Sequence, residues 1–272
     1  MKEHGIETKP GGILLDLDGT LYHGTKRIEG ADRLIDKLKE WRLPYRFVTN
    51  NSSAAPETVA ERLNAMGIAA EASEVCTSAQ AAAEHIARLK SGAAVFIIGE
   101  AGLIRAAEEA GLQVVEEAPD FVLQGIDREL SYARLAAAVR HIHNGATYVL
   151  TNPDLLLPSE TGLMPGAGSI GAMLTAAGGQ EPMLIGKPSP ILMDYALDKL
   201  ELTADETWVV GDNLATDIAA GKASGCGTVL VLTGLTNADN MESYASIAGC
   251  RPDAVCANLD ELISYISSST GI

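Results

Sequence analysis

Positive charge is scarce in this chain of 272 residues, which carries 20 lysines and arginines against 36 aspartates and glutamates. The formal net charge of −16 argues against nucleic acid or an anionic membrane as a partner, because both repel an acidic surface. The same charge is an obstacle for any small anionic substrate. A site for such a substrate must therefore supply its own positive charge, from a lysine or a metal ion.

Cysteine pairs and long apolar runs are also missing. The four cysteines form no Cys-x-x-Cys pair, so we expect reduced thiols and a reducing compartment. No apolar run reaches the length of a membrane span, and the polar segment 1–10 has no apolar stretch typical of a secretion signal. These features predict a soluble cytoplasmic protein. The length of the chain favours two domains.

The most informative stretch is the apolar run 13–15 with the residues that follow it, Asp16-Leu17-Asp18-Gly19-Thr20. The run is typical of a strand buried on both faces, and Gly19 lets the chain turn sharply beyond it. Ligands bind at this end of a strand in open parallel sheets. Two carboxylates placed there repel each other unless a cation such as Mg²⁺ joins them. Considered alone, the two aspartates are more simply explained as turn residues.

The rest of the chain alternates predicted strands and helices, which indicates an α/β fold with a parallel, doubly wound, Rossmann-like sheet. The expected elements include a strand at Met183–Ile185, a helix at Thr216–Ala223 and a long loop at Thr151–Gly168. No element is predicted between Leu232 and Ala254.

Polar groups follow four of the predicted strands, and they would gather at one edge if all four strands lay in one parallel sheet. Such a set fits phosphoryl transfer. One aspartate can act as the nucleophile, and a second can protonate the leaving oxygen and later activate water. A threonine hydroxyl and backbone N–H groups can hold phosphate oxygens, while a lysine and Mg²⁺ supply positive charge. The four groups are Asp16 with Asp18, Thr49 with Asn50, Lys187, and Asp212 with Asp217.

These motifs resemble those of haloacid-dehalogenase-type phosphatases, and more narrowly those of the NagD-type branch. The resemblance covers nearly the whole chain. Position 213 is Asn where some eukaryotic relatives carry Arg, so their substrate choice does not transfer. The matching segments are Asp16–Tyr22, Thr49–Ser53, Thr151–Asp154, Pro165–Gly168, Gly186–Pro188 and Gly211–Asp217.

The resemblance implies that Asp16 is the nucleophile and Asp18 the general acid and base. It implies Mg²⁺ on Asp16, Asp212 and the backbone carbonyl of Asp18, with Asn213 and Asp217 supporting these ligands. It also implies a catalytic core made of residues 1–79 and 182–272, with residues 80–181 inserted as an α/β cap that governs substrate specificity. The substrate-binding residues it implies are Thr49, Asn50, Asn51, Lys187, Asp127, Asn152 and Asp154. For Asp127 and Asp154, an ordinary turn or capping role is an equal alternative.

A second motif points to a different class of protein. Residues 166–171 match Gly-x-Gly-x-x-Gly, the dinucleotide fingerprint of Rossmann oxidoreductases. The segment before it reads as a loop and not a strand, and the next predicted strand ends in Gly-Lys without the acid that would bind a ribose. A tight turn into a packed helix is the simpler interpretation.

The sequence therefore predicts a Mg²⁺-dependent hydrolase of small phosphomonoesters, such as sugar phosphates, nucleoside monophosphates and p-nitrophenyl phosphate, through an aspartyl-phosphate. Two alternatives stay open: a phosphotransferase or mutase with the same chemistry, and a metabolite-binding regulator with little turnover. The expected partner is a small phosphorylated metabolite, with no nucleic acid and no membrane. The resemblance also makes a homodimer plausible.

Overall fold

The computed structural model describes residue 6, residues 9–159 and residues 162–271. The chain divides into two compact units. The first unit contains Met1–Thr49, Glu57–Cys76 and Lys187–Ile272, and the second contains Asn50–Pro56 and Thr77–Gly186. Most of the segment 1–10, on which the expectation about a secretion signal rests, lies outside the described residues. Among the described residues, no helix has the length and apolar character needed to cross a bilayer.

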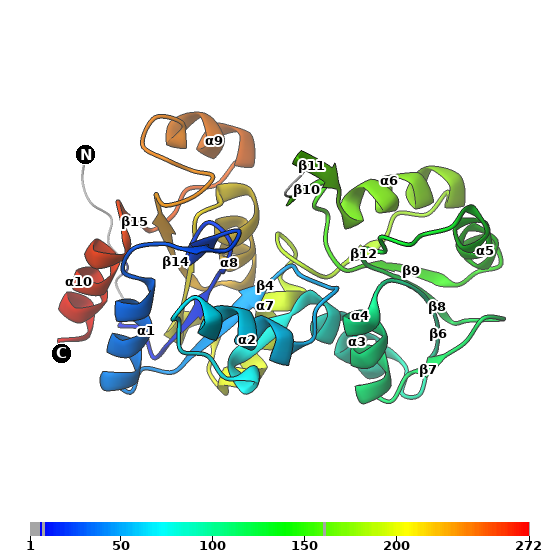
Figure 1. Cartoon of the computed structure of the whole chain (residues 1–272), viewed down its shortest axis with the longest axis horizontal. Helices are drawn as coiled ribbons and strands as arrows, with labels where there is room; N and C mark the ends of the chain where they lie inside the picture. The colour runs from blue at the N-terminus through cyan, green and yellow to red at the C-terminus, as the bar shows by residue number, and fades with distance from the viewer. Residues whose placement is uncertain (1–5, 7–8, 160–161, 272) are drawn as a thin grey trace. The chain divides into compact units, whose positions relative to one another are not determined.

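The first unit is built on a six-stranded sheet (Figure 1). The pairs that join β1 to β13 and β4, and β14 to β13 and β15, are all parallel. Every residue of β1 and of β13 is buried, as expected for strands that are covered on both faces. The strand order is β15 (Ala254–Cys256), β14 (Gly227–Val231), β13 (Thr207–Gly211), β1 (Gly12–Leu15), β4 (Tyr45–Thr49) and β5 (Val75–Thr77).

Helices cover this sheet. The amphipathic helix α1 (Ala31–Glu40) buries Leu34, Ile35 and Leu38 and packs beside α10 (Leu259–Thr270), the blue and red helices of Figure 1. The helix α7 contacts β1 and β4. The remaining elements of this unit are α2 (Pro56–Ala65), α7 (Ile191–Leu200), α8 (Ala219–Ser224), α9 (Met241–Ala248), the hairpin of β2 (Tyr22–His23) and β3 (Lys26–Arg27), 3-10 turns at Ala72–Glu74 and Ala204–Glu206, and a π-helix at Leu214–Ile218.

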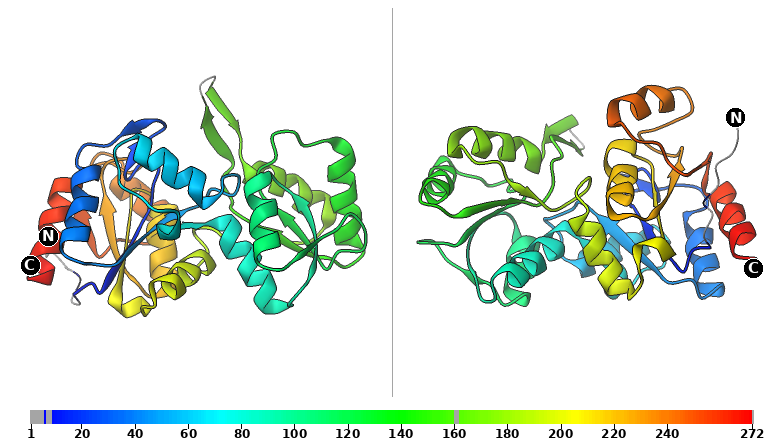
Figure 2. Two further views of the ribbon diagram at one scale, coloured as in Figure 1. Left: turned by 60° about the horizontal axis from the view of Figure 1, so that its bottom comes forward. Right: turned by 180° about the vertical axis from the view of Figure 1, so that it is seen from behind.

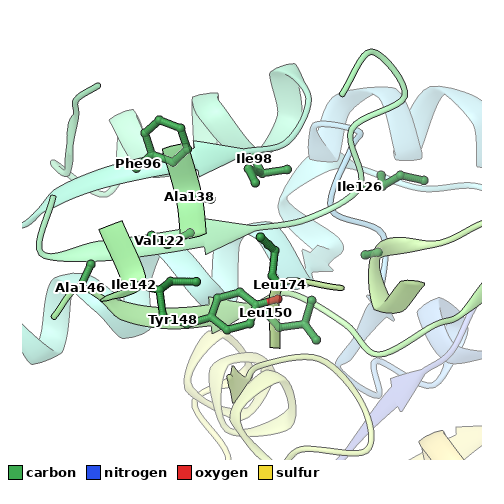
Figure 3. Close-up of a cluster of buried hydrophobic side chains, with 11 residues drawn as sticks. Phe96, Ile98, Val122, Ile126, Ala138, Ile142, Ala146, Tyr148, Leu150 and Leu174 are labelled. Atoms are coloured by element: carbon green, nitrogen blue, oxygen red, sulfur yellow. The ribbon is translucent and has the colours of Figure 1, made fainter. Parts of the chain in front are cut away.

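The second unit has its own five-stranded parallel sheet, with α3 and α4 on one face and α5 and α6 on the other (Figure 2). Figure 3 shows the core on the α5 and α6 side, where aromatic and branched side chains of the sheet meet Ala138, Ile142 and Leu174. The strand order is β12 (Met183–Leu184), β9 (Thr147–Leu150), β8 (Phe121–Gln124), β6 (Ala94–Ile98) and β7 (Gln113–Val114), and the helices are α3 (Ser78–Leu89), α4 (Ala101–Glu109), α5 (Tyr132–His143) and α6 (Ala167–Gly178).

The α/β class and the parallel sheet are confirmed, but one expected placement is wrong. The strand at 183–185 was predicted to belong to the same sheet as β1 and β13. In the structure β12 covers Met183–Leu184 and pairs with β9 in the second unit. An apolar run indicates a buried strand but does not show which strand it pairs with. The strand β12 lies at the edge of the five-stranded sheet of the second unit.

Three further expectations need correction. The segment Thr151–Gly168 is not a loop, because β10 (Leu156–Ser159) and β11 (Gly162–Pro165) form an antiparallel hairpin in its described part. The helix expected at Thr216–Ala223 is a π-helix at Leu214–Ile218 that continues as α8. The helix α9 occupies a stretch in which no element was predicted.

Candidate active site

Three neighbouring strands of the first unit end in polar residues. Because β13, β1 and β4 are adjacent and parallel, their carboxyl ends lie at one edge of the sheet. Asp16 follows β1, and its backbone N–H still bonds the carbonyl of Val210, 2.9 Å away. Asp212 follows β13, and Thr49 is the last residue of β4. The sheet thus brings two carboxylates and a hydroxyl-bearing residue to the same edge, as the sequence predicted.

Lys187 reaches this edge although no strand of the sheet carries it. Its side chain is 4% exposed and pairs with carboxylate oxygens of both Asp16 and Asp217, with 2.7 Å between Nζ and Oδ1 of Asp217. Nζ also donates to the carbonyl of Val48. Burial by itself would lower the pKa of Lys187, but the charges of the two aspartates outweigh it and raise that pKa. The ammonium group is therefore charged, and a buried cation stands among the acids.

One lysine does not neutralise this cluster. Burial, followed by the charge of Asp217, raises the pKa of Asp16 to about 8, even though Lys187 acts in the opposite direction. Burial and Asp217 likewise raise the pKa of Asp212 to about 6. Two acids that would ionise readily in water thus resist ionisation here. The cluster lacks positive charge.

Asp18 has a different environment from Asp16. Its side chain is exposed. Partial burial raises its pKa, opposed by His23, the backbone N–H of Gly24 and Arg62. A carboxyl group that faces solvent and has a raised pKa can keep a proton and exchange it, which suits a general acid.

Thr20 connects the two strand ends. Its hydroxyl is fully buried and lies 3.2 Å from Oδ2 of Asp16 and 3.4 Å from Oδ1 of Asp212. The sequence motif contained Thr20, but no role for it was predicted.

The loop after β14 also reaches the site, and sequence reasoning missed it. The backbone N–H of Leu235 donates to Oδ2 of Asp212 at 2.6 Å, and the hydroxyl of Thr233 donates to the carbonyl of Gly19 at 2.8 Å. A signal for the loop itself was available, since Thr233 follows the buried strand β14 as the other polar side chains follow theirs.

Asp217 and Asn213 are held by the π-helix. Oδ2 of Asp217 accepts from the backbone N–H of Asn213 at 3.1 Å, and the Asn213 side chain accepts from the N–H of Ala215 at 2.9 Å. Asn213 thus caps the π-helix. Few protein segments are π-helical, and those that are often lie at functional sites. Asp217 directs its other oxygen at Lys187.

The second unit brings together three of the predicted substrate-binding residues. The Asn152 side chain donates to the carbonyl of Asn50 at 2.8 Å, and Nδ2 of Asn50 lies 3.4 Å from Oδ2 of Asp154. The Ser78 hydroxyl donates to the same carbonyl at 2.7 Å. The segment that begins at Asn50 is therefore fixed to the second unit by side chains, whereas Thr49 belongs to the first unit.

Two other predicted substrate-binding residues hold turns. Oδ1 of Asn51 accepts from the backbone N–H groups of Ser53 and Ala54, both at 2.9 Å. Oδ1 of Asp127 accepts from the N–H of Glu129 at 3.0 Å. For Asp127 this is the turn role that the sequence left open.

The chemistry of the acidic cluster fits a divalent metal ion. Oxygen atoms of Asp16, Asp212 and Asp217 lie within 4.8 Å of one another. Carboxylate oxygens are the ligands that hard cations such as Mg²⁺ and Mn²⁺ prefer. The raised pKa values of Asp16 and Asp212 indicate that the site favours a further cation. The side chain of Asp18 is not part of this group.

The glycine motif at 166–171 has a packing explanation. The strand before it, β11, belongs to an antiparallel hairpin and not to the parallel βαβ unit that a dinucleotide site requires. A Cβ at Gly166 would lie 2.1 Å from the carbonyl oxygen of Asp154, and a Cβ at Gly168 would lie 2.1 Å from that of Pro153. Because Gly166 and Gly168 have no side chain, the backbone of residues 153–154 can lie close to the start of α6.

Comparisons with known proteins show the family to which the chain belongs. Sequence models described as haloacid dehalogenase-like hydrolase and HAD-hydrolase-like match residues 13–113 and 184–262. The chain is 44% identical to 5'-nucleotidase YutF of Bacillus subtilis over 94% of this chain and 98% of that protein, and 43% identical to an acid sugar phosphatase of Staphylococcus haemolyticus over 85% and 88%. A solved p-nitrophenyl phosphatase from Archaeoglobus fulgidus superposes with a TM-score of 0.89 at 37% identity, over 94% of this chain and 99% of that one. On these matches, and with the expected motifs in place, the chain belongs to the haloacid dehalogenase-like hydrolase family.

Proposed function

We propose that this protein is a Mg²⁺-dependent phosphatase that hydrolyses small phosphomonoesters through an aspartyl-phosphate on Asp16. The observation that carries the proposal is the buried group of Asp16, Lys187, Asp212 and Asp217, in which one fixed ammonium group faces three carboxylates. Such a group is costly to bury unless further positive charge joins it. A divalent metal ion would supply that positive charge.

The first step transfers the phosphoryl group to the enzyme. A carboxylate oxygen of Asp16 attacks phosphorus, the bond from phosphorus to the ester oxygen breaks, and Asp18 gives its proton to the leaving oxygen. Asp18 suits this task because its carboxyl group is exposed and has a raised pKa. In the second step, Asp18 takes a proton from water while the water oxygen attacks phosphorus and the bond to Asp16 breaks. Free phosphate leaves, and both aspartates return to their starting forms.

Lys187, Thr49 and the metal site supply positive charge and hydrogen bonds. Lys187 is held by Asp16 and Asp217, so its ammonium group can meet phosphoryl oxygens without reorganising. Thr49, at the end of β4, is the proposed hydroxyl ligand for a phosphoryl oxygen. Mg²⁺, bound by Asp16, Asp212 and the backbone carbonyl of Asp18, would neutralise the carboxylates and the phosphoryl group.

The similar proteins suggest the substrate class. Their names describe a 5'-nucleotidase, acid sugar phosphatases and p-nitrophenyl phosphatases. We propose that this chain acts on nucleoside monophosphates, sugar phosphates and aryl phosphates. We propose the second unit as the part of the chain that selects among them, the first unit as the catalytic core, and the cytoplasm as the compartment.

The test is phosphate release from a panel of these esters, with Mg²⁺ and again with a chelator. We expect chelator-sensitive release by the wild-type protein. Asp16→Asn should lower turnover by at least about 10⁴-fold, because an amide is not a nucleophile, while far-ultraviolet circular dichroism stays unchanged. Near-normal turnover in a folded Asp16→Asn protein would refute the aspartyl-phosphate.

A further inference from the structure

The segment Thr233–Leu235, which follows β14, makes contacts on two sides of the acidic site. On one side, the N–H of Leu235 donates to the carboxylate of Asp212. On the other, the Thr233 hydroxyl donates to the carbonyl of Gly19, and its own carbonyl accepts from Nε2 of His23 at 2.8 Å. One short segment thus holds both the carboxylate after β13 and the turn that carries Asp18.

Gly234 stands at the closest approach in this segment. A Cβ added to it would lie 2.1 Å from Oδ2 of Asp212 and 2.7 Å from the carbonyl oxygen of Gly19. Its backbone is outside the left-handed region, so the constraint is space and not φ. The carboxylate of Asp212 therefore rests directly on the backbone of this segment.

The position of Asp212 matters because its carboxylate is buried and has few partners among the described residues that could hold it. The hydrogen bond from the N–H of Leu235 to Oδ2 selects one orientation of the two carboxylate oxygens. Groups that hold a metal ligand in this way commonly change metal affinity by about 10- to 100-fold when they are altered.

We propose that Thr233–Leu235 is a positioning segment for the metal site, which fixes the carboxylate of Asp212 and ties it to the turn at Gly19. This inference rests on the proposed function, since it assumes that the acidic cluster binds a divalent ion. Thr233, Gly234 and Leu235 do not themselves bind the ion. They set the geometry of a residue that does.

The experiment compares Gly234→Ala with Gly11→Ala. Gly11 belongs to the same unit, also lies outside the left-handed region, and has no atom closer than 3.4 Å to an added Cβ. Mg²⁺ affinity is measured by isothermal titration calorimetry, and Mn²⁺ affinity by electron paramagnetic resonance. Both readouts are independent of turnover. We expect Gly234→Ala to bind either ion about 10- to 100-fold more weakly than the wild type. Gly11→Ala should bind as the wild type does.

A second variant covers the case in which Gly234→Ala does not fold. Thr233→Val removes the hydroxyl that bonds Gly19 but leaves the N–H of Leu235 in place, and we expect a severalfold loss of Mg²⁺ affinity. The proposal is overturned if folded Gly234→Ala, or Thr233→Val in its place, binds Mg²⁺ as tightly as the wild type. A wild-type protein that binds neither ion would instead refute the proposed function.

Discussion

Lys187 is the residue on which the charge balance of the site depends. It is buried, and its ammonium group contacts two of the three clustered acids. Removing one partner from a buried ion pair leaves the other charge without compensation, which typically costs about 3–5 kcal/mol. Lys187 therefore contributes to the stability of the metal-free protein as well as to its proposed chemistry.

We predict that Lys187→Met lowers the free energy of unfolding by about 3–5 kcal/mol at neutral pH in the presence of a chelator. The reason is that Asp16, Asp212 and Asp217 would then share a buried site without a cation. Urea unfolding followed by circular dichroism measures this change. Phosphatase activity should also be lost.

The matched control is Lys37→Met. The side chain of Lys37, in α1, is 44% exposed and pairs with Glu40 on the surface. Because surface pairs contribute little, we expect a change within about 0.5 kcal/mol. Equal effects of the two substitutions would mean that the buried pairs of Lys187 contribute no more to the free energy of unfolding than a surface pair does.

At the level of residues, the sequence predicted the members of the site better than their supports. Asp16, Asp212, Asp217 and Lys187 do converge, because strand ends and short motifs are visible in a sequence. The N–H of Leu235 is not visible in this way, since a backbone donor can belong to any residue type.

Among the elements, α6 shows how a glycine motif arises from packing. The N–H of Gly168 donates to the carbonyl of Asp154 at 3.0 Å, and the hydroxyl of Ser169 donates to that of Leu155 at 2.6 Å. The segment at 153–155 therefore lies directly on the start of the helix. A side chain at position 168 would have to displace this backbone.

We predict that Gly168→Ala destabilises the second unit by about 2 kcal/mol or more, because its Cβ would meet a backbone oxygen that cannot move independently. Gly171→Ala is the control on the same helix. There the nearest atoms, at 3.1 and 3.3 Å, belong to side chains of Leu150 and Gln124, and alanine favours the helix by up to about 1 kcal/mol.

The measurement is chemical denaturation of the two variants and the wild type under one set of conditions. We expect Gly171→Ala to stay within about 1 kcal/mol of the wild type and Gly168→Ala to fall clearly below it. If Gly168→Ala were no less stable than Gly171→Ala, the packing account of this motif would be wrong.

The elements that sequence reasoning missed have separate physical causes. The hairpin of β10 and β11 contains Pro158 and Pro165, and proline normally counts against a strand, yet both strands are edges, where a missing N–H is tolerated. The helix α9 could have been found, since Met241, Tyr244, Ala245 and Ala248 have helical spacing and pack around Leu214, Ile218 and Leu230. The sheet to which β12 belongs could not have been found, because partner choice is a tertiary property.

For the molecule as a whole, the dominant property is its net charge of −16. A phosphomonoester at neutral pH is also an anion, so it meets a repulsive field before it reaches the cations at the site. Salt screens distant exposed charges much more than it screens buried ones.

We predict that raising the ionic strength from about 0.01 to about 0.15 M lowers KM for a phosphomonoester by about two- to fivefold, because the Debye length shrinks from about 30 to about 8 Å. The value of kcat should change little. Initial rates at constant, saturating Mg²⁺ measure both.

As a control, the measurement is repeated with a second salt. Potassium chloride and choline chloride should act alike, because the effect depends on screening and not on a bound ion. An increase of KM with salt would show instead that attraction by a local positive field governs substrate entry.

The placement of Trp208 has a consequence for spectroscopy. Its indole is fully buried in β13 and stacks on Tyr265, with 5.4 Å between the ring centroids. The chain has two tryptophans, and the other, Trp41, follows α1 in the same unit. Intrinsic tryptophan fluorescence therefore reports on the first unit alone. An unfolding event confined to residues 77–186 would be silent in that signal and visible only through tyrosine absorbance or circular dichroism.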